Sequence, residues 1–79
     1  MTKLRNIGPK SWNMLFEAGF SDVDAICKVG AVATFAEVRN RNSAVSLNLL
    51  WALYAGLQDR DWRTVTAEEK AELLHELEG

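Results

Sequence analysis

The chain has only one cysteine, Cys27, one histidine, His75, and one proline, Pro9. A lone cysteine cannot form an internal disulfide bond, and no basic segment followed by an apolar run opens the chain, so we expect a cytoplasmic location. A metal site needs several ligands, and a catalytic nucleophile needs a base beside it. The sequence therefore predicts no enzyme, no metal site and no other cofactor, and it suggests no small-molecule substrate.

A long hydrophobic run is also missing. The most apolar stretch, residues 44–57, contains Ser46 and Asn48 and is shorter than the roughly 20 residues that a membrane-spanning helix needs. We interpret it as a core helix. The whole chain has 79 residues, and domains near this size bury only about 60% of their unfolded surface. The sequence therefore predicts one domain over residues 1–79 with a densely apolar core.

Charge is low overall, at −2, but it is unevenly distributed. Residues 1–63 contain eight basic and six acidic side chains, whereas residues 64–79 contain one basic and five acidic side chains. The acidity therefore belongs to the end of the chain. A net negative charge argues weakly against nucleic acid as the partner.

Helix start and stop residues divide the chain into five segments. Pro9 suits a first helical turn, and Gly19 can adopt the left-handed conformation that ends a helix. Ser21 and Ser46 are good N-cap residues, and Gly30 separates two apolar segments. We predict a compact all-α bundle of about five short helices, over residues 9–18, 21–29, 31–39, 46–57 and 66–78, with a polar loop at residues 39–43 and breaks at Gly56 and residues 58–63.

Apolar spacing predicts which faces are buried. Trp12, Leu15 and Phe16 share one face of the first helix, and Cys27 is expected in the core as a small apolar residue. The helix over residues 46–57 is apolar around nearly its whole circumference, as expected of a central helix with Leu50, Trp51 and Leu53 inside. Trp62 is expected to fold back onto this core, because a large ring is costly to leave in water.

The last helix has the clearest local pattern. Thr66 and Glu69 match a capping box, in which each side chain accepts a hydrogen bond from the other residue's backbone N–H. Leu73, Leu74 and Leu77 then form a narrow apolar stripe. We expect the glutamates and His75 to face water.

The segment before the first helix could bind an anion. Gly8 lets the backbone turn tightly, and the helix start that follows has free N–H groups at the positive end of the helix dipole. Lys10 and Ser11 lie in the first turn, and Lys3 and Arg5 come just before it. These five residues are the candidate site for a phosphate. Taken by itself, this segment favours the alternative, in which Gly8 and Pro9 form an ordinary helix start.

The carboxylates Asp59 and Asp61 alternate with Arg60 and Arg63 in the loop after the central helix. Two carboxylates this close could be imagined as an acid pair of the glycosidase type. Surface ion pairing is the better interpretation.

Several blocks of sequence resemble known proteins. Residues 7–11 with Leu15, Ala18 and Gly19 are similar to the hairpin of helix-hairpin-helix proteins and, more loosely, to the carboxy-terminal domain of the RNA polymerase alpha subunit. A fuller resemblance, to the carboxy-terminal domain of the TfoX (Sxy) proteins, covers residues 6–11, 18–20, 29–32, 45–53 and 60–62. It implies a five-helix domain, of the helix-hairpin-helix or SAM-like type, from bacteria that regulate natural competence, DNA uptake and associated transcription.

Two functions remain open at this point. In the first, the domain is a noncatalytic regulatory module that binds a protein, either a transcription component or a second copy of itself. In the second, the first helix start binds DNA phosphates weakly and without sequence preference. The net negative charge favours the protein partner.

Overall fold

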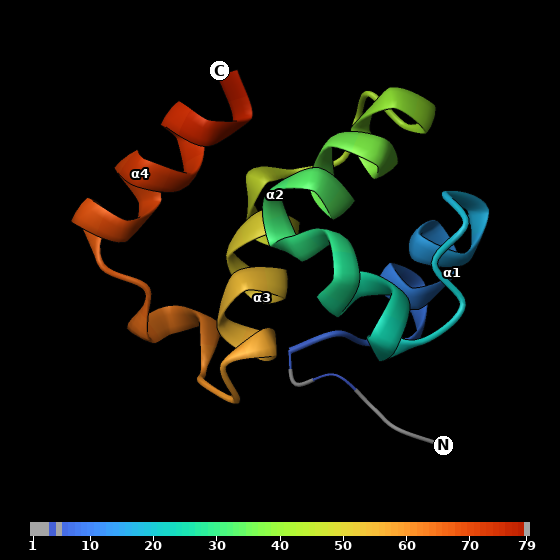
Figure 1. Ribbon diagram of the computed structural model, residues 1–79, viewed down its shortest axis with the longest axis horizontal. Coiled ribbons are helices and arrows are strands. Elements are labelled where there is room, and N and C mark those ends of the chain that lie inside the picture. The colour runs from blue at the N-terminus through green and yellow to red at the C-terminus, as the bar shows by residue number, and fades with distance from the viewer. Residues whose placement is uncertain (1–3, 5, 79) are drawn as a thin grey trace.

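Four α-helices and one turn of 3₁₀ helix make up the computed structural model, which describes residues 4 and 6–78. They are α1 (Pro9–Glu17), α2 (Val23–Arg41), α3 (Leu47–Leu57), η1 (Trp62–Thr64) and α4 (Ala67–Glu78). The part of the chain that is described contains no strand, so the all-helical prediction is confirmed. In Figure 1, α2 and α3 occupy the middle of the molecule, with α1 on one side and α4 on the other.

Helix α1 begins and ends where the sequence predicts. Gly8 is its N-cap, Pro9 is its first residue, and Gly19 follows it with φ +96°, in the left-handed region that favours glycine. Leu15 is fully buried, but Phe16 is 46% exposed, so the core covers only part of the apolar face of α1. Its ring instead lies against the half-buried ring of Trp12, with the centroids 5.7 Å apart.

Helix α2 joins two segments that the sequence analysis separated. Gly30 has φ 86° and ψ 166°, which are not helical values, yet the helix resumes after this one residue and continues to Arg41. The described part of the chain is therefore counted as four α-helices, the second of which contains the break predicted at Gly30, and residues 39–41 are helical instead of loop. A glycine can adopt this conformation at little steric cost, so two helical segments meet at a kink at Gly30.

Two finer predictions for α2 are also wrong. Asp22, not Ser21, is the N-cap, and its Oδ1 accepts a hydrogen bond from the Ala25 N–H at 2.9 Å. Cys27 is exposed and not in the core. Ile26 is fully buried, and the next residue of a helix is turned by about 100°, which places Cys27 outside.

Helix α3 is the core of the molecule, as predicted. Ser46 caps it by accepting a hydrogen bond from the Asn48 N–H at 2.9 Å. Leu50 and Leu53 are fully buried and Trp51 is 6% exposed. Gly56 is buried inside this helix and does not mark the break; the chain turns afterwards, where Asp59 has φ 55°.

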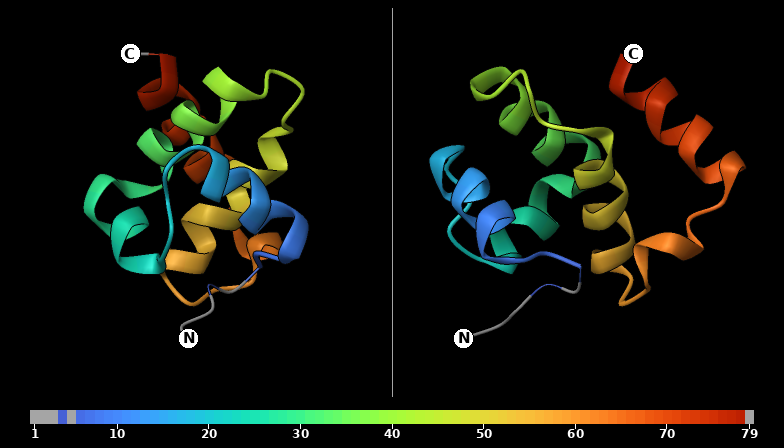
Figure 2. Two further views of the ribbon diagram at one scale, coloured as in Figure 1. Left: turned by 90° about the vertical axis from the view of Figure 1, so that its right-hand side faces the viewer. Right: turned by 180° about the vertical axis from the view of Figure 1, so that it is seen from behind.

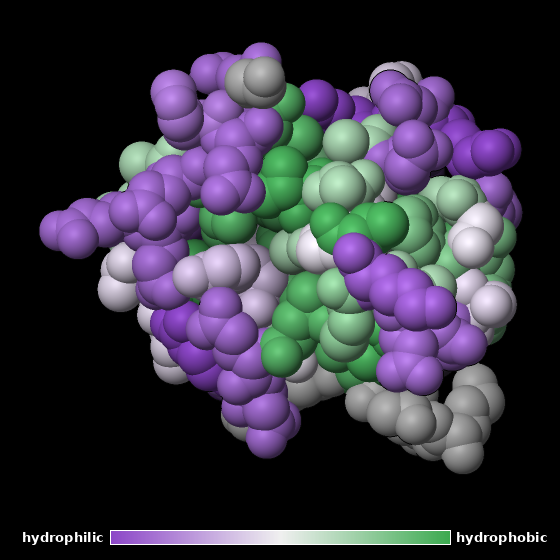
Figure 3. Space-filling model, viewed as in Figure 1, coloured by the Kyte–Doolittle hydropathy of each residue, from purple (hydrophilic) through white to green (hydrophobic). Residues whose placement is uncertain are grey.

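Helix α4 packs its leucine stripe toward the rest of the molecule. Leu73 is buried, and Leu74 and Leu77 lie partly buried against the core. In Figure 3, apolar side chains gather between α4 and α2, and hydrophilic side chains cover the outer side of α4. The chain reaches α4 through η1, which brings the acidic helix to the side of α3 away from α1, as the right view in Figure 2 shows.

Trp62 does not fold back onto the core. It is 38% exposed at the start of η1, and Val65, which is 5% exposed, occupies the buried position of this segment. None of the described helices is long and apolar enough to cross a membrane.

Candidate functional site: a groove between α1 and α3

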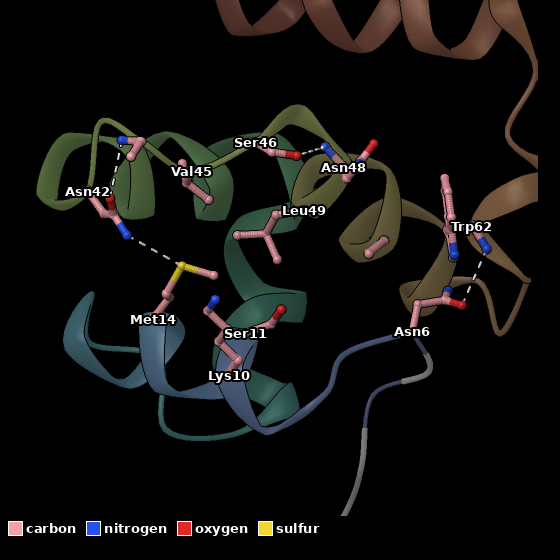
Figure 4. A pocket seen from close by; sticks show the side chains of 12 residues that line it. Asn6, Lys10, Ser11, Met14, Asn42, Val45, Ser46, Asn48, Leu49 and Trp62 are labelled. Carbon is pink, nitrogen blue, oxygen red and sulfur yellow. Dashed lines mark hydrogen bonds between the residues drawn. The ribbon is translucent and has the colours of Figure 1, made fainter.

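An open groove of about 480 Å³ lies between α1, the loop from α2 to α3, the start of α3 and η1. Figure 4 shows the side chains of α1 and those of the α2–α3 loop approaching it from opposite sides, with Trp62 at one end. Its volume is within the range of about 300–1,000 Å³ that is usual for ligand pockets. The lining residues are Asn6, Lys10, Ser11, Met14, Asn42, Ala44, Val45, Ser46, Asn48, Leu49, Ala52 and Trp62.

The floor and one end of the groove are apolar. Met14 of α1 faces Leu49 of α3 across it, and Val45 lies beside them (Figure 4). The exposed ring of Trp62 adds an aromatic surface at the far end. An apolar floor of this kind releases bound water when an apolar side chain enters it.

Asparagine side chains connect the walls of the groove. Asn6 donates through Nδ2 to the Arg60 carbonyl at 2.8 Å and accepts through Oδ1 from the Trp62 N–H at 3.3 Å. Its φ of 74° lies in the left-handed region, which asparagine tolerates better than most residues. Asn42 donates to the Met14 sulfur at 3.5 Å. Asn6 therefore holds η1 against the segment before α1, and Asn42 holds the α2–α3 loop against the middle of α1.

Lys10 is the charged residue of the lining, and no acidic side chain is part of it. Lys10 is exposed, and its side chain makes no ion pair with another described residue. Helices α1 and α3 both begin at this groove, and neither has an acidic residue in its first turn. Helix starts carry partial positive charge, which adds to that of Lys10. Because no acidic side chain lines the groove, nothing in the lining offsets this positive charge.

The predicted phosphate site overlaps this groove in part. Lys10 and Ser11 line it, and Gly8 is the exposed N-cap of α1 beside it. The other two predicted site residues, Lys3 and Arg5, lie outside the described residues. The clustering of all five around one anion therefore stays a prediction.

Sequence reasoning missed the opposite wall of the groove. Asn42, Ser46 and Asn48 come from a segment about thirty residues further along the chain, and Trp62 comes from later still. Ser46 was recognised only as a helix cap. Nothing in their local spacing indicates that they face α1, because only the packing of α1 against α2 and α3 brings the two segments together.

A polar cluster positions η1, and with it Trp62. Arg60 donates to both carboxylate oxygens of Glu69, from Nη1 to Oε2 at 2.9 Å and from Nη2 to Oε1 at 3.1 Å. Tyr54 donates its hydroxyl to Glu69 Oε2 at 2.8 Å. Arg60 also donates to the Thr64 carbonyl at 3.0 Å. The expectation that every glutamate of α4 faces water is therefore wrong for Glu69, which is partly buried.

These hydrogen bonds set the ionisation of Glu69. The Arg60 guanidinium, followed by the Thr66 N–H and the Tyr54 hydroxyl, holds the pKa of Glu69 well below its ordinary value of 4.5. The second ion pair of this region joins Arg63 Nη2 to Asp61 Oδ2 at 2.9 Å. Ion pairing is therefore confirmed for Asp61 and Arg63, whereas the carboxylate that pairs with Arg60 is Glu69.

Metal-binding residues do not cluster in the part of the chain that is described: no three of its His, Cys, Asp and Glu side chains could hold an ion together. A second hollow, of about 500 Å³, lies between Ile7, Val23, Cys27 and Leu57, with Asp59 at its edge. Cys27 and Asp59 are its lining residues with polar side chains, whereas the groove between α1 and α3 has six that can orient a ligand and is the stronger candidate: Asn6, Lys10, Ser11, Asn42, Ser46 and Asn48.

The fold and groove define a small all-helical domain with an open surface of mixed polarity. A family model described as the TfoX C-terminal domain matches residues 1–77, so the chain belongs to this family. The family resemblance inferred from the sequence blocks is thereby confirmed.

Solved structures from Listeria monocytogenes share the fold. A tetragonal crystal form of a protein of unknown function is 27% identical, with a TM-score of 0.86, over 95% of this chain and 93% of the other. A triclinic crystal form of an uncharacterized protein is 29% identical, with a TM-score of 0.85, over 98% of this chain and 91% of the other. No curated protein matches.

Proposed function

We propose that this chain is a noncatalytic regulatory module that binds a protein partner in the control of competence or associated transcription. Membership of the TfoX C-terminal domain family supports the regulatory role. The structural observation that carries the proposal is the exposed Trp62 ring at the end of a groove with an apolar floor. Tryptophan is enriched among the residues that dominate binding energy at protein interfaces.

The chemistry of the groove supports binding over catalysis. Its lining has one lysine, one aromatic ring, amides and two serine hydroxyls, and it has no carboxylate, imidazole or thiol. Neither serine hydroxyl is hydrogen-bonded to a described side chain that could act as its general base, since Ser46 accepts from the Asn48 N–H and Ser11 has no described partner. We propose a cytoplasmic location, in keeping with a role in transcription.

The test replaces Trp62 in the cell. In the source bacterium, we expect deletion of the gene to change the transcript levels of competence genes and the frequency of DNA uptake. Trp62→Ala should reproduce the deletion. Phe16→Ala is the matched control, because Phe16 is an exposed aromatic residue that does not line the groove.

Two results would contradict the proposal. If the deletion leaves transcripts and DNA uptake unchanged, the regulatory role is wrong. If Trp62→Ala behaves as the parent in cells that contain equal amounts of folded protein, the interaction does not use this surface.

DNA-phosphate binding is the second candidate function. The observation that favours it is the exposed start of α1, where Lys10 and Ser11 face the groove and no acidic residue occupies the first turn. Lys3 and Arg5 would add electrostatic support. A DNA titration at two salt concentrations separates it from the first candidate.

A further inference from the structure

We propose that the groove between α1 and α3 takes an extended peptide segment that carries an apolar side chain next to an aspartate or glutamate. The apolar side chain would lie on the floor between Met14 and Leu49, and the carboxylate would pair with Lys10. This inference rests on the proposed function, since it names the chemistry of the protein partner.

The charge expected of the peptide follows from the residues that line the groove. Lys10 carries the positive charge of the groove, and the lining contains no negative charge to balance it. The starts of α1 and α3, both without an acidic residue in the first turn, reinforce the same sign. Charge complementarity therefore favours an acidic segment and opposes a basic one.

The class of partner follows from the number of cations and the nature of the floor. Binding of nucleic acid without sequence preference depends mainly on several lysine or arginine contacts to phosphates, and one such residue lines the groove. The floor consists of the side chains of Met14, Val45, Leu49 and Ala52, which suit an aliphatic side chain. A peptide satisfies both features, because one residue can fill the floor while its neighbour pairs with Lys10.

Polar groups along the rim suit an extended backbone. The Asn48 side-chain amide makes no hydrogen bond with another described residue, and Figure 4 shows it at the edge of the groove. The Ser11 hydroxyl, at the opposite edge, is also without a partner among the described residues. An amide and a hydroxyl can each donate to and accept from a peptide backbone, which is how the groove would bind the main chain.

The experiment selects peptides from a phage-displayed library of random twelve-residue sequences, with the whole chain as the target. We expect enriched sequences to pair Leu, Ile, Met or Phe with Asp or Glu. Synthetic copies should shift the NMR resonances of Lys10, Met14, Asn48 and the Trp62 indole when they are added to the protein.

A charge reversal tests the role of Lys10. Lys10→Glu should weaken the selected acidic peptides by at least about tenfold, because like charges would then face each other. The same library selected against Lys10→Glu should enrich basic sequences. Lys28→Glu is the matched control, since Lys28 is an exposed lysine outside the lining, and it should bind like the parent. Circular dichroism confirms that both variants are folded.

Several outcomes overturn the inference. The inference is wrong if acidic–apolar peptides are enriched no more than on an unrelated protein, or if the selected peptides shift resonances away from the groove. It is also wrong if these peptides bind Lys10→Glu as tightly as the parent. A twelve-nucleotide thymidine strand that shifts the groove resonances, where peptides do not, would overturn it as well. If any of these occurs while Trp62→Ala still abolishes regulation in cells, the peptide chemistry is wrong and the proposed function stands. If Trp62→Ala has no effect in cells, the proposed function fails separately.

Discussion

At the scale of single residues, Thr34 is a polar side chain buried among apolar ones. It is fully buried in α2, and its Oγ1 has no hydrogen-bond partner among the described residues. A threonine hydroxyl in a helix usually bonds to the carbonyl three or four residues earlier. The residue four positions earlier is Gly30, whose non-helical backbone moves its carbonyl out of the helical position.

We therefore expect Thr34→Val to stabilise the protein. A buried hydroxyl without a partner costs about 1–3 kcal/mol in lost hydration, and valine keeps the shape without this cost. Thr34→Ser is the control, because it keeps the hydroxyl and loses only a methyl group, so it should lower stability. Urea unfolding measures both variants. A valine variant less stable than the parent would show that the hydroxyl has a partner in solution.

Trp51 of α3, unlike Thr34, buries a large apolar ring in the core. Its side chain is 6% exposed, and the Lys70 ammonium lies 5.4 Å from the centre of its ring. Trp51→Ala should lower the free energy of unfolding by about 3–5 kcal/mol through the cavity it leaves. Thermal unfolding measures this loss. Trp62→Ala, at a 38% exposed position, should lose much less, and an equal loss for both would contradict the core assignment.

At the scale of helices, the capping box decides where α4 begins. The Glu69 N–H donates to Thr66 Oγ1 at 3.2 Å, and the Thr66 N–H donates to Glu69 Oε1 at 3.0 Å, so the predicted reciprocal pair is confirmed. Thr66→Ala should destabilise the protein by about 0.5–2 kcal/mol. Thr66→Ser keeps the hydroxyl and should remain close to the parent. Urea unfolding compares the two, and an alanine variant as stable as the parent would refute the cap.

The same glutamate makes the docking of α4 dependent on pH. Its hydrogen bonds with Arg60 and Tyr54 join α4 to the end of α3, and they hold the pKa of Glu69 below its ordinary value of 4.5. Because the folded pKa is the lower one, the stabilisation is present above pH 4.5 and is lost as the pH falls toward the folded pKa. Solvent partly screens this pair, since the two side chains remain 31% and 24% exposed.

Glu69→Gln tests this dependence. The variant should melt at a lower temperature than the parent at pH 7, and the difference should shrink as the pH is lowered below 4.5. Glu72→Gln is the control, because Glu72 is exposed on the same helix. A difference between Glu69→Gln and the parent that stays constant from pH 7 to pH 3 would show that the carboxylate charge is not the cause.

At the scale of the whole molecule, charge separates along the chain and in space. Residues 64–79 carry a net charge of −4 and residues 1–63 a net charge of +2. Helix α4 contains all five acidic residues of this last segment, and it lies on the far side of α3 from α1 (Figure 1). None of the residues that line the groove belongs to the acidic helix.

This arrangement makes a definite prediction for DNA. Non-specific binding with a dissociation constant of about 10⁻⁴–10⁻⁶ M normally involves several phosphate contacts, more than this chain's positive charge supports, so we expect no DNA binding even at low salt. If the parent does bind, removal of Lys3, Arg5 and Lys10 together should abolish it. Each residue removed singly should reduce the slope of log affinity against log salt by about one. That outcome would favour the phosphate function over the peptide one.

The sequence alone determined the features that depend on neighbours in the chain. Gly8 and Pro9 predicted the start of α1, Ser46 the start of α3, and Thr66 with Glu69 the start of α4, because a cap bonds to a backbone group within about three residues. The central position of α3 was also predictable, since a helix that is apolar on all sides must be surrounded. The family resemblance could be recognised for the same reason, since the matching blocks are local runs of sequence.

Tertiary structure alone decided which side chains are buried and which distant segments contact each other. The exposure of Cys27 and Trp62 and the pairing of Arg60 with Glu69 depend on how the helices pack. The groove is the clearest case, because its two walls come from α1 and from a loop about thirty residues further along the chain. No local pattern encodes such a surface, since burial and contact between distant segments are set by the packing of the whole chain.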